Sequence, residues 1–257
     1  MLTFLKKIRK SLVDSGSVSS GHAMSAGMKY LLYAVGEIIL VVLGILMALQ
    51  INNWNQKRVD RQRAVDYHQR LIEDLDFIIT RNENTNKHAI RVMNSITETI
   101  EILEKGRIES EEEQRVIDYT MVMFPRLSRQ ISGLSTWDEM KSNGDMNLIY
   151  NIELRKNVDA LQDFINLAHE VFSKHALAIR NDQSNYSKYS RTFVDSITLD
   201  ETVFSNFDAM AADKNFINQF SIVTSSWRSQ AAFAENIGSR ASRLKKQIED
   251  ELESMSQ

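Results

Sequence analysis

Histidine is the side chain best suited to bind a metal ion in a protein without cysteine, and this chain has five histidines and no cysteine. A common helical zinc site needs two histidines four residues apart, with a catalytic glutamate beside the first. No two histidines here have that spacing, and His169 and His175 do not share one face of a helix. His68 falls on a row of apolar residues, so core packing explains it better than metal binding. We therefore predict neither a metal site nor a cofactor.

Other catalytic signatures are missing from the sequence as well. No glycine-rich stretch precedes a Lys-Ser/Thr pair, as a phosphate-binding loop requires, and no nucleophile elbow with flanking glycines occurs. Acidic runs such as "ESEEE" and "EDELES" are typical of solvated helix faces. We predict that the protein is not an enzyme. The enzyme alternative would require a polar pocket with strongly shifted titratable groups.

Glu37 is the residue whose chemistry is least expected in its surroundings, because it lies inside a long apolar run. An ionised carboxylate in lipid costs on the order of a few kcal/mol, which the neighbouring Ile, Leu and Val residues can outweigh. Gly36, Leu40, Gly44 and Ala48 follow at steps of four along the same run, and the small pair Gly44 and Ala48 lets a second helix approach closely. We therefore expect a polar helix–helix interface in the membrane, formed by Gly36, Glu37, Gly44 and Ala48. Three alternatives remain open: a carboxylate that reaches the headgroups, a proton- or ion-handling role, and pairing with a different membrane protein.

The run around Glu37 has the length of a transmembrane helix. Residues 30–51 would span roughly 33 Å as a helix, close to the thickness of the hydrocarbon core. Tyr30 at one end and Trp54 at the other are amphipathic aromatics of the kind that anchor a span at the two interfaces. The run is too long and starts too late for a cleaved signal peptide. We predict a single transmembrane helix over residues 29–55, with the lipid bilayer as a partner.

The segment before the span bears on orientation. Residues 1–28 begin with "MLTFLKKIRKSLV", which has apolar residues at helical spacing and lysines between them, and continue as a flexible linker. A basic amphipathic helix of this kind lies on an anionic, usually cytoplasmic, leaflet. We expect a single-pass protein of the inner (cytoplasmic) membrane, with its N-terminus in the cytoplasm and the bulk of the chain in the periplasm. The net charge of −3 does not favour nucleic acid as a partner.

The remainder of the chain, residues 56–257, reads as helical. One proline and nine glycines are too few for the many tight turns of a sheet protein. A seam of apolar residues at steps of three and four predicts a helix over residues 57–104 that stops at Gly106. The seam weakens over residues 81–88, so a break there is an open alternative. The seam consists of Ala64, His68, Leu71, Leu75, Ile78, Asn82, Thr85, Ala89, Val92, Ile96 and Leu103.

Further helices follow the first long one. We predict a helix over residues 109–124 ended by Pro125, and a short helix that Ser135 caps and Gly144 stops. Asn151 caps the next helix, residues 180–196 form a polar connection, and a last helix covers residues 214–254. Each has an apolar stripe that needs a partner. The prediction is an all-α protein, in which the transmembrane helix precedes an elongated antiparallel helical bundle with coiled-coil-like seams.

Two segments resemble an uncharacterised bacterial family of single-span membrane proteins. They are "KYLLYAVGEIILVVLGILMALQINNWN" (residues 29–55) and "STWDEMKSNGDMNLIYNIELRKNV" (residues 135–158). The family combines a YxxGEIxLVxxGIxxALQINNWN span with a later T(Y/W)xExKSxGxxNLIxNxELR motif. The resemblance implies a topology and no reaction. The residues that match the second motif include Trp137, Ser142, Gly144, Asn147, Leu148 and Arg155.

Physical chemistry suggests a packing role for this second motif. Gly144 permits a left-handed turn, and Arg155 can pair with an acid such as Asp138 or Glu139. A ligand pocket or partner surface at this helix–loop–helix is the alternative. The side chains expected to anchor the loop in the bundle are Trp137, Met140 and Leu148.

The function expected from these features is that of a membrane-anchored, self-associating helical bundle. It would serve as a non-enzymatic envelope adaptor, scaffold or sensor-like module, with a homo-oligomer formed through the transmembrane helix. The alternative is an oligomeric ion or proton channel, or a transport subunit, that uses Glu37. Ion flux that disappears in Glu37→Gln would favour the alternative.

Overall fold

The computed structural model describes residues 26–127, 133–180, 186–198 and 201–256. The predicted amphipathic helix and nearly all of the predicted linker in residues 1–28 lie outside the described residues. The chain divides after Val59 into two compact units, Met1–Val59 and Asp60–Gln257. The first unit is described through the start of helix α2 (Ala26–Lys105), and the second unit holds the remaining elements.

The described chain is almost entirely helical, as the sequence predicts. After α2 come α3 (Glu111–Met123), α4 (Ser135–Asn143), the 3-10 helix η1 (Asp145–Leu148) and α5 (Ile152–Arg180). The last part contains α6 (Tyr186–Tyr189), strands β1 (Ser190–Val194) and β2 (Glu201–Ser205), α7 (Phe207–Ala212) and α8 (Lys214–Ser256).

Helix α2 continues without interruption through residues 81–88, so the break left open by the sequence does not occur. Polar side chains of this stretch find backbone partners. The amide of Asn82 donates to the carbonyl of Ile78 at 2.8 Å, and the amide of Asn86 donates to the carbonyl of Ala231 in α8 at 2.9 Å. The helix ends at Gly106 as predicted. With φ of +75°, Gly106 donates its N–H to the carbonyls of the preceding turn.

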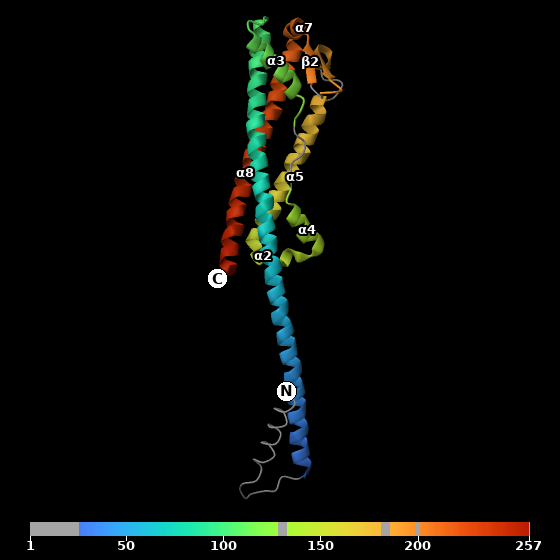
Figure 1. The fold of residues 1–257 in the computed structure, drawn as a ribbon, viewed down its shortest axis with the longest axis vertical. Coiled ribbons are helices and arrows are strands. Elements are labelled where there is room, and N and C mark those ends of the chain that lie inside the picture. The colour runs from blue at the N-terminus through green and yellow to red at the C-terminus, as the bar shows by residue number, and fades with distance from the viewer. Residues whose placement is uncertain (1–25, 128–132, 181–185, 199–200, 257) are drawn as a thin grey trace. The chain divides into compact units, whose positions relative to one another are not determined.

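In the second unit, α8 runs antiparallel to α2 (Figure 1). Lys245 Nζ lies 2.7 Å from Asp76 Oδ1, whereas Asn86, later in α2, contacts Ala231, earlier in α8. The contact positions therefore rise along one helix as they fall along the other. The pairing of α2 with α8 matches the predicted antiparallel arrangement.

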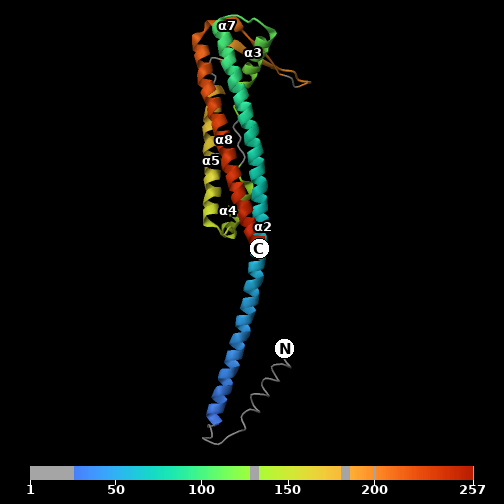
Figure 2. The ribbon, with the colours of Figure 1, turned by 90° about the vertical axis from the view of Figure 1, so that its left-hand side faces the viewer.

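Helix α8 is also antiparallel to α5 (Figure 2). Asn157 donates to Gln247 Oε1 at 3.0 Å, and the rings of Phe172 and Phe233 meet edge to face with centroids 5.4 Å apart. Because α8 is antiparallel to both α2 and α5, α5 runs parallel to this part of α2. The segment with α3, α4 and η1 connects the end of α2 to the start of α5, which two parallel helices require.

The core of this bundle consists of the predicted apolar stripes. Along α2 the seam residues recur at alternating steps of four and three, the spacing of a left-handed coiled coil. Most seam residues are buried, and Thr85 is partly exposed. Burial of one stripe from each of three helices gives the contiguous apolar interior that a domain of this size needs. Its largest fully buried side chains are Trp137, Trp227, Phe172, Phe216 and Phe220.

The predicted polar connection over residues 180–196 is wrong in part, because it contains β1, which pairs with β2 in an antiparallel hairpin from Ser190↔Ser205 to Val194↔Glu201. Threonine, valine and phenylalanine favour strands. The turn after β1 has no glycine or proline at its start, so the sequence gives no signal for it. Asp195 stabilises the start of this turn, because its Oδ1 accepts the N–H groups of Ile197 and Thr198 at 2.7 and 2.9 Å.

Candidate functional site

The residues predicted to be functional fall into two groups that lie in different units. The first group, on α2 in the first unit, consists of Tyr30, Gly36, Glu37, Gly44, Ala48 and Trp54. The second group, in the second unit, consists of Trp137, Gly144, Asn147 and Arg155.

The N-terminal part of α2 is long and apolar enough to cross a membrane. Among the described residues, α2 is the one helix that meets this test. Nothing in the described chain covers its apolar side chains: Tyr30 is 77% exposed and Trp54 is 68% exposed. A run of exposed apolar residues this long requires lipid or another protein around it.

Helix geometry places three of the predicted interface residues on one face of α2. Gly44 and Ala48 follow Glu37 by seven and eleven residues, which puts all three within roughly 40° of arc around the helix axis. Gly36 lies about 100° from Glu37. Apart from the backbone of the helix itself, none of the described residues lies within 4 Å of the position that a Cβ atom would take at Gly36 or Gly44. Packing among the described residues therefore does not explain either glycine.

Three residues of the second group lie in the motif loop, which we define as residues 134–151, and the fourth, Arg155, lies on α5. Trp137 is fully buried, and its Nε1 donates to Asp159 Oδ1 on α5 at 2.8 Å. Met140 is fully buried and Leu148 is 4% exposed, so these side chains anchor the loop as expected. Gly144 ends α4 in the left-handed conformation with φ of +75°. Asn147 is exposed.

Arg155 does not form either of the ion pairs predicted for it. Glu139 instead binds Arg70 of α2, and Asp138 binds Lys141 within α4. The Nε of Arg155 is buried without a hydrogen-bond partner among the described residues. Asp138 pairs with a lysine three residues further along α4, whereas the partner of Glu139 is 69 residues away in the chain and could not be found from local spacing.

Four residues of α2, which we call the polar stripe, hold the motif loop: Arg63, Tyr67, Arg70 and Asp74. The hydroxyl of Tyr67 donates to Asp145 Oδ2 at 2.8 Å, and Arg63 donates to the same oxygen. Asp145 is 8% exposed, so its charge is held in a largely buried position. The Arg70 guanidinium binds Glu139 through two nitrogens, one of them 3.0 Å from Oε1. This bidentate geometry fixes orientation as well as distance.

The start of α4 is capped by α2 and not by Ser135, which corrects the predicted cap. Asp74 Oδ2 accepts the N–H of Thr136 at 2.8 Å, and Asp74 Oδ1 accepts the hydroxyl of Ser135 at 3.0 Å. The N-cap position is Leu134, whose own N–H donates to Gln162 Oε1 at 2.8 Å. A carboxylate suits a helix N-terminus because of the unpaired N–H groups and the positive dipole end.

The electrostatics of the loop follow from these contacts. The hydrogen bond from Arg70 lowers the pKa of the Glu139 carboxyl below its ordinary value, and the same bond raises the pKa of Arg70. The polar stripe was missed in the sequence although its signal is there. Residues 63, 67, 70 and 74 have the same four–three–four spacing as the apolar seam one position later, so they form a second row on the same helix.

Histidines contribute no metal centre within the described residues, where no group of three or more His, Cys, Asp or Glu side chains could hold a metal ion. His68 is fully buried on the seam, with Nδ1 2.6 Å from the carbonyl oxygen of Ala64. His88 contacts the Trp227 ring edge to face, and burial, with Arg91 nearby, lowers its pKa.

Comparisons of the chain with models of protein families, with curated proteins and with solved structures gave no match. The resemblance carried by residues 29–55 and 135–158 therefore stays a prediction.

Proposed function

We propose that this protein is a membrane-anchored, self-associating helical bundle that acts as a non-enzymatic adaptor, scaffold or sensor-like module of the cell envelope. The proposal includes one crossing of the inner membrane by α2, a cytoplasmic N-terminus and a periplasmic bundle. It also includes membership in the single-span family that the two motifs resemble.

One observation carries the proposal: Glu37, Gly44 and Ala48 share a face of α2 that nothing in the described chain covers. Glycine inside a helix costs about 1 kcal/mol relative to alanine. That cost needs a reason, and close approach of a second helix supplies one. A second copy would also receive the Glu37 side chain away from lipid, where two such groups can share a hydrogen bond.

The bundle supports a role in binding or support rather than in chemistry. Its largest buried side chains are apolar, and the polar stripe is used to hold the motif loop to α2. Helix α2 is continuous from the apolar run into the bundle seam.

The test is the oligomeric state of the full-length protein in uncharged detergent and in lipid nanodiscs. Gly44→Leu and Ala48→Leu should each shift the chain from oligomer to monomer, because a large side chain keeps a second helix away. Val42→Leu is the matched control, since it enlarges a side chain on the opposite face of α2. An oligomer that is the same size in all four proteins would overturn the proposal.

Glu37 itself favours a second candidate function, an oligomeric proton or ion channel. An ionisable residue inside a span often marks an ion pathway. Liposomes with the wild-type protein would then conduct, and the flux would disappear in Glu37→Gln. Oligomers without flux would leave the scaffold as the better proposal.

A further inference from the structure

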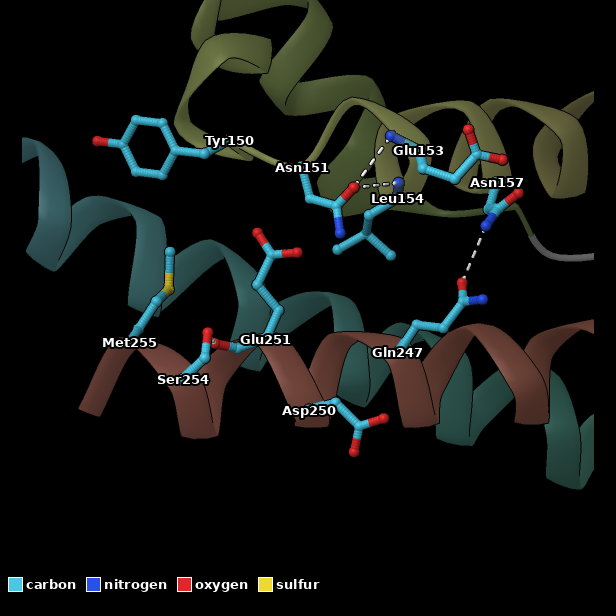
Figure 3. A pocket seen from close by; sticks show the side chains of 10 residues that line it. All are labelled: Tyr150, Asn151, Glu153, Leu154, Asn157, Gln247, Asp250, Glu251, Ser254 and Met255. Carbon is cyan, nitrogen blue, oxygen red and sulfur yellow. Dashed lines mark hydrogen bonds between the residues drawn. The ribbon is translucent and has the colours of Figure 1, made fainter. Parts of the chain in front are cut away.

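A hollow lies between the start of α5 and the end of α8, entirely within the second unit (Figure 3). Its volume is about 630 Å³, which falls in the range of small-molecule sites in proteins. One part of its wall is acidic, from Glu153, Asp250 and Glu251. Another part is apolar, from Tyr150, Leu154 and Met255.

Glu251 is the least exposed of the acids, and its carboxylate points into the space between the two helices (Figure 3). The side chain is 12% exposed. Its Oε2 is buried and has no hydrogen-bond partner among the described residues. An unpaired buried carboxylate oxygen is costly, so this position calls for a donor.

His68 of α2 lies next to Glu251 but does not supply the missing hydrogen-bond donor. The imidazole is fully buried, and its Nδ1 lies 2.6 Å from the carbonyl oxygen of Ala64. A carbonyl oxygen can only accept, so Nδ1 carries the proton in this bond. Nε2 faces Glu251 Oε1 at 3.6 Å, which is beyond hydrogen-bond distance, and it has no hydrogen-bond partner among the described residues. In this geometry His68 donates no hydrogen bond to Glu251.

Two lysines near the hollow each contact a carboxylate other than that of Glu251. Lys245 of α8 has its Nζ 2.7 Å from Asp76 Oδ1 on α2. Lys156 lies 3.8 Å from Glu153, at an exposed position. Neither lysine pairs with Glu251 in the described chain.

We propose that this hollow binds an organic cation, an alkylammonium or guanidinium group that places its N–H donors against Glu251. The alkyl stem would lie along Leu154 and Met255. The exposed ring of Tyr150 offers a face to the cation. The cation can belong to a free amine or to a lysine or arginine side chain of a peptide, and both present the same chemistry. This inference does not depend on self-association of the span.

The experiment uses the full-length protein in uncharged detergent, with calorimetry to measure binding and ring-labelled histidine to observe His68 by NMR. The probes are 1,5-diaminopentane, a short capped peptide with one central lysine, and 1,5-pentanediol as the neutral match. Saturable binding of a cationic probe, with a change in the His68 ring signals and no binding of the diol, is the expected result. The stronger of the two cationic probes identifies the source of the cation.

Two variants assign the binding to Glu251. Glu251→Gln keeps the size of the side chain and should weaken binding at least tenfold. Glu249→Gln removes the same charge from α8 outside the hollow and should leave the affinity within twofold of wild type. Asp250→Asn, with a smaller expected loss, serves as the second variant if Glu251→Gln lowers the helical content. Equal affinity in all variants, or equal binding of the diol, would overturn the proposal. So would an imidazolium signal from His68 at neutral pH without binding of any probe, because His68 would then supply the missing donor itself.

Discussion

The hydroxyl of Tyr67 on α2 donates a 2.8 Å hydrogen bond to Asp145 in the motif loop, 78 residues later in the chain. Both side chains are buried, at 7% and 8% exposure. Asp145 also accepts from Arg63 of the same stripe. These hydrogen bonds connect α2 to the motif loop.

Replacing Asp145 with alanine should lower the free energy of unfolding by about 2 kcal/mol, because Tyr67 is left with a buried, unpaired hydroxyl and Arg63 loses its partner. The measurement is urea unfolding of the full-length protein in uncharged detergent, followed by circular dichroism. Glu170→Ala is the control, since it breaks an exposed pair with Lys174 and should change the free energy of unfolding much less. Similar losses for the two variants would contradict the assigned role of Asp145.

Removing the carboxylate of Asp74 should release the first turn of α4. The expected cost of Asp74→Ala is about 1 kcal/mol, typical of a lost N-cap. Hydrogen exchange at the Thr136 amide should become faster, because that N–H loses its acceptor. Ser135→Ala should have a much smaller effect, since its hydroxyl only donates to Asp74. A larger effect at Ser135 would restore it as the cap.

At Gly144 the backbone conformation, rather than crowding, determines what is tolerated. Its φ is +75°, and no atom of the residues that the structure describes lies within 4 Å of where a Cβ would be. Gly144→Ala should therefore cost about 1–2 kcal/mol in unfolding free energy, whereas Gly144→Asn should cost less. Gly106 has the same φ and the same open surroundings, so Gly106→Ala should cost a similar amount. An alanine tolerated without loss at Gly144 would show that the loop adopts another conformation.

Acid should weaken the contact between Arg70 and Glu139. The hydrogen bond from Arg70 holds the pKa of Glu139 below its ordinary value of 4.5. The stabilisation is therefore complete above about pH 4.5 and is lost as the pH falls through the lower, folded-state pKa. The difference in unfolding free energy between wild type and Glu139→Gln should be largest at neutral pH and should shrink at pH 3. A difference that stays constant with pH would mean that the carboxylate is not the partner that matters.

Much of the helical framework was predictable because local rules and burial agree. The spacing of Leu71, Leu75 and Ile78 predicts a buried seam, and these residues are buried. Gly106 and Asn151 mark helix ends by mechanisms that act within a few residues, and both act as predicted.

The contacts that the sequence did not reveal depend on residues far apart in the chain. Asp74 caps α4 although it lies 62 residues before Thr136 in the chain, so the cap is not the local candidate Ser135. Glu139 forms its ion pair with Arg70 and not with Arg155. The hairpin was missed for a different reason. The start of its turn is held by the Asp195 side chain, whereas glycine and proline are the residues that usually indicate a turn in a sequence.

The two rows on α2 are out of step by a single residue: Arg63 precedes Ala64, Tyr67 precedes His68, Arg70 precedes Leu71 and Asp74 precedes Leu75. A shift of α2 by one residue in its packing register would place the guanidinium groups of Arg63 and Arg70 and the carboxylate of Asp74 in the apolar core. The same shift would expose Leu71 and Leu75 to solvent. This part of α2 therefore has a single packing register in the bundle. A force that rotates or shifts it must move the bundle with it or break its contacts with the bundle.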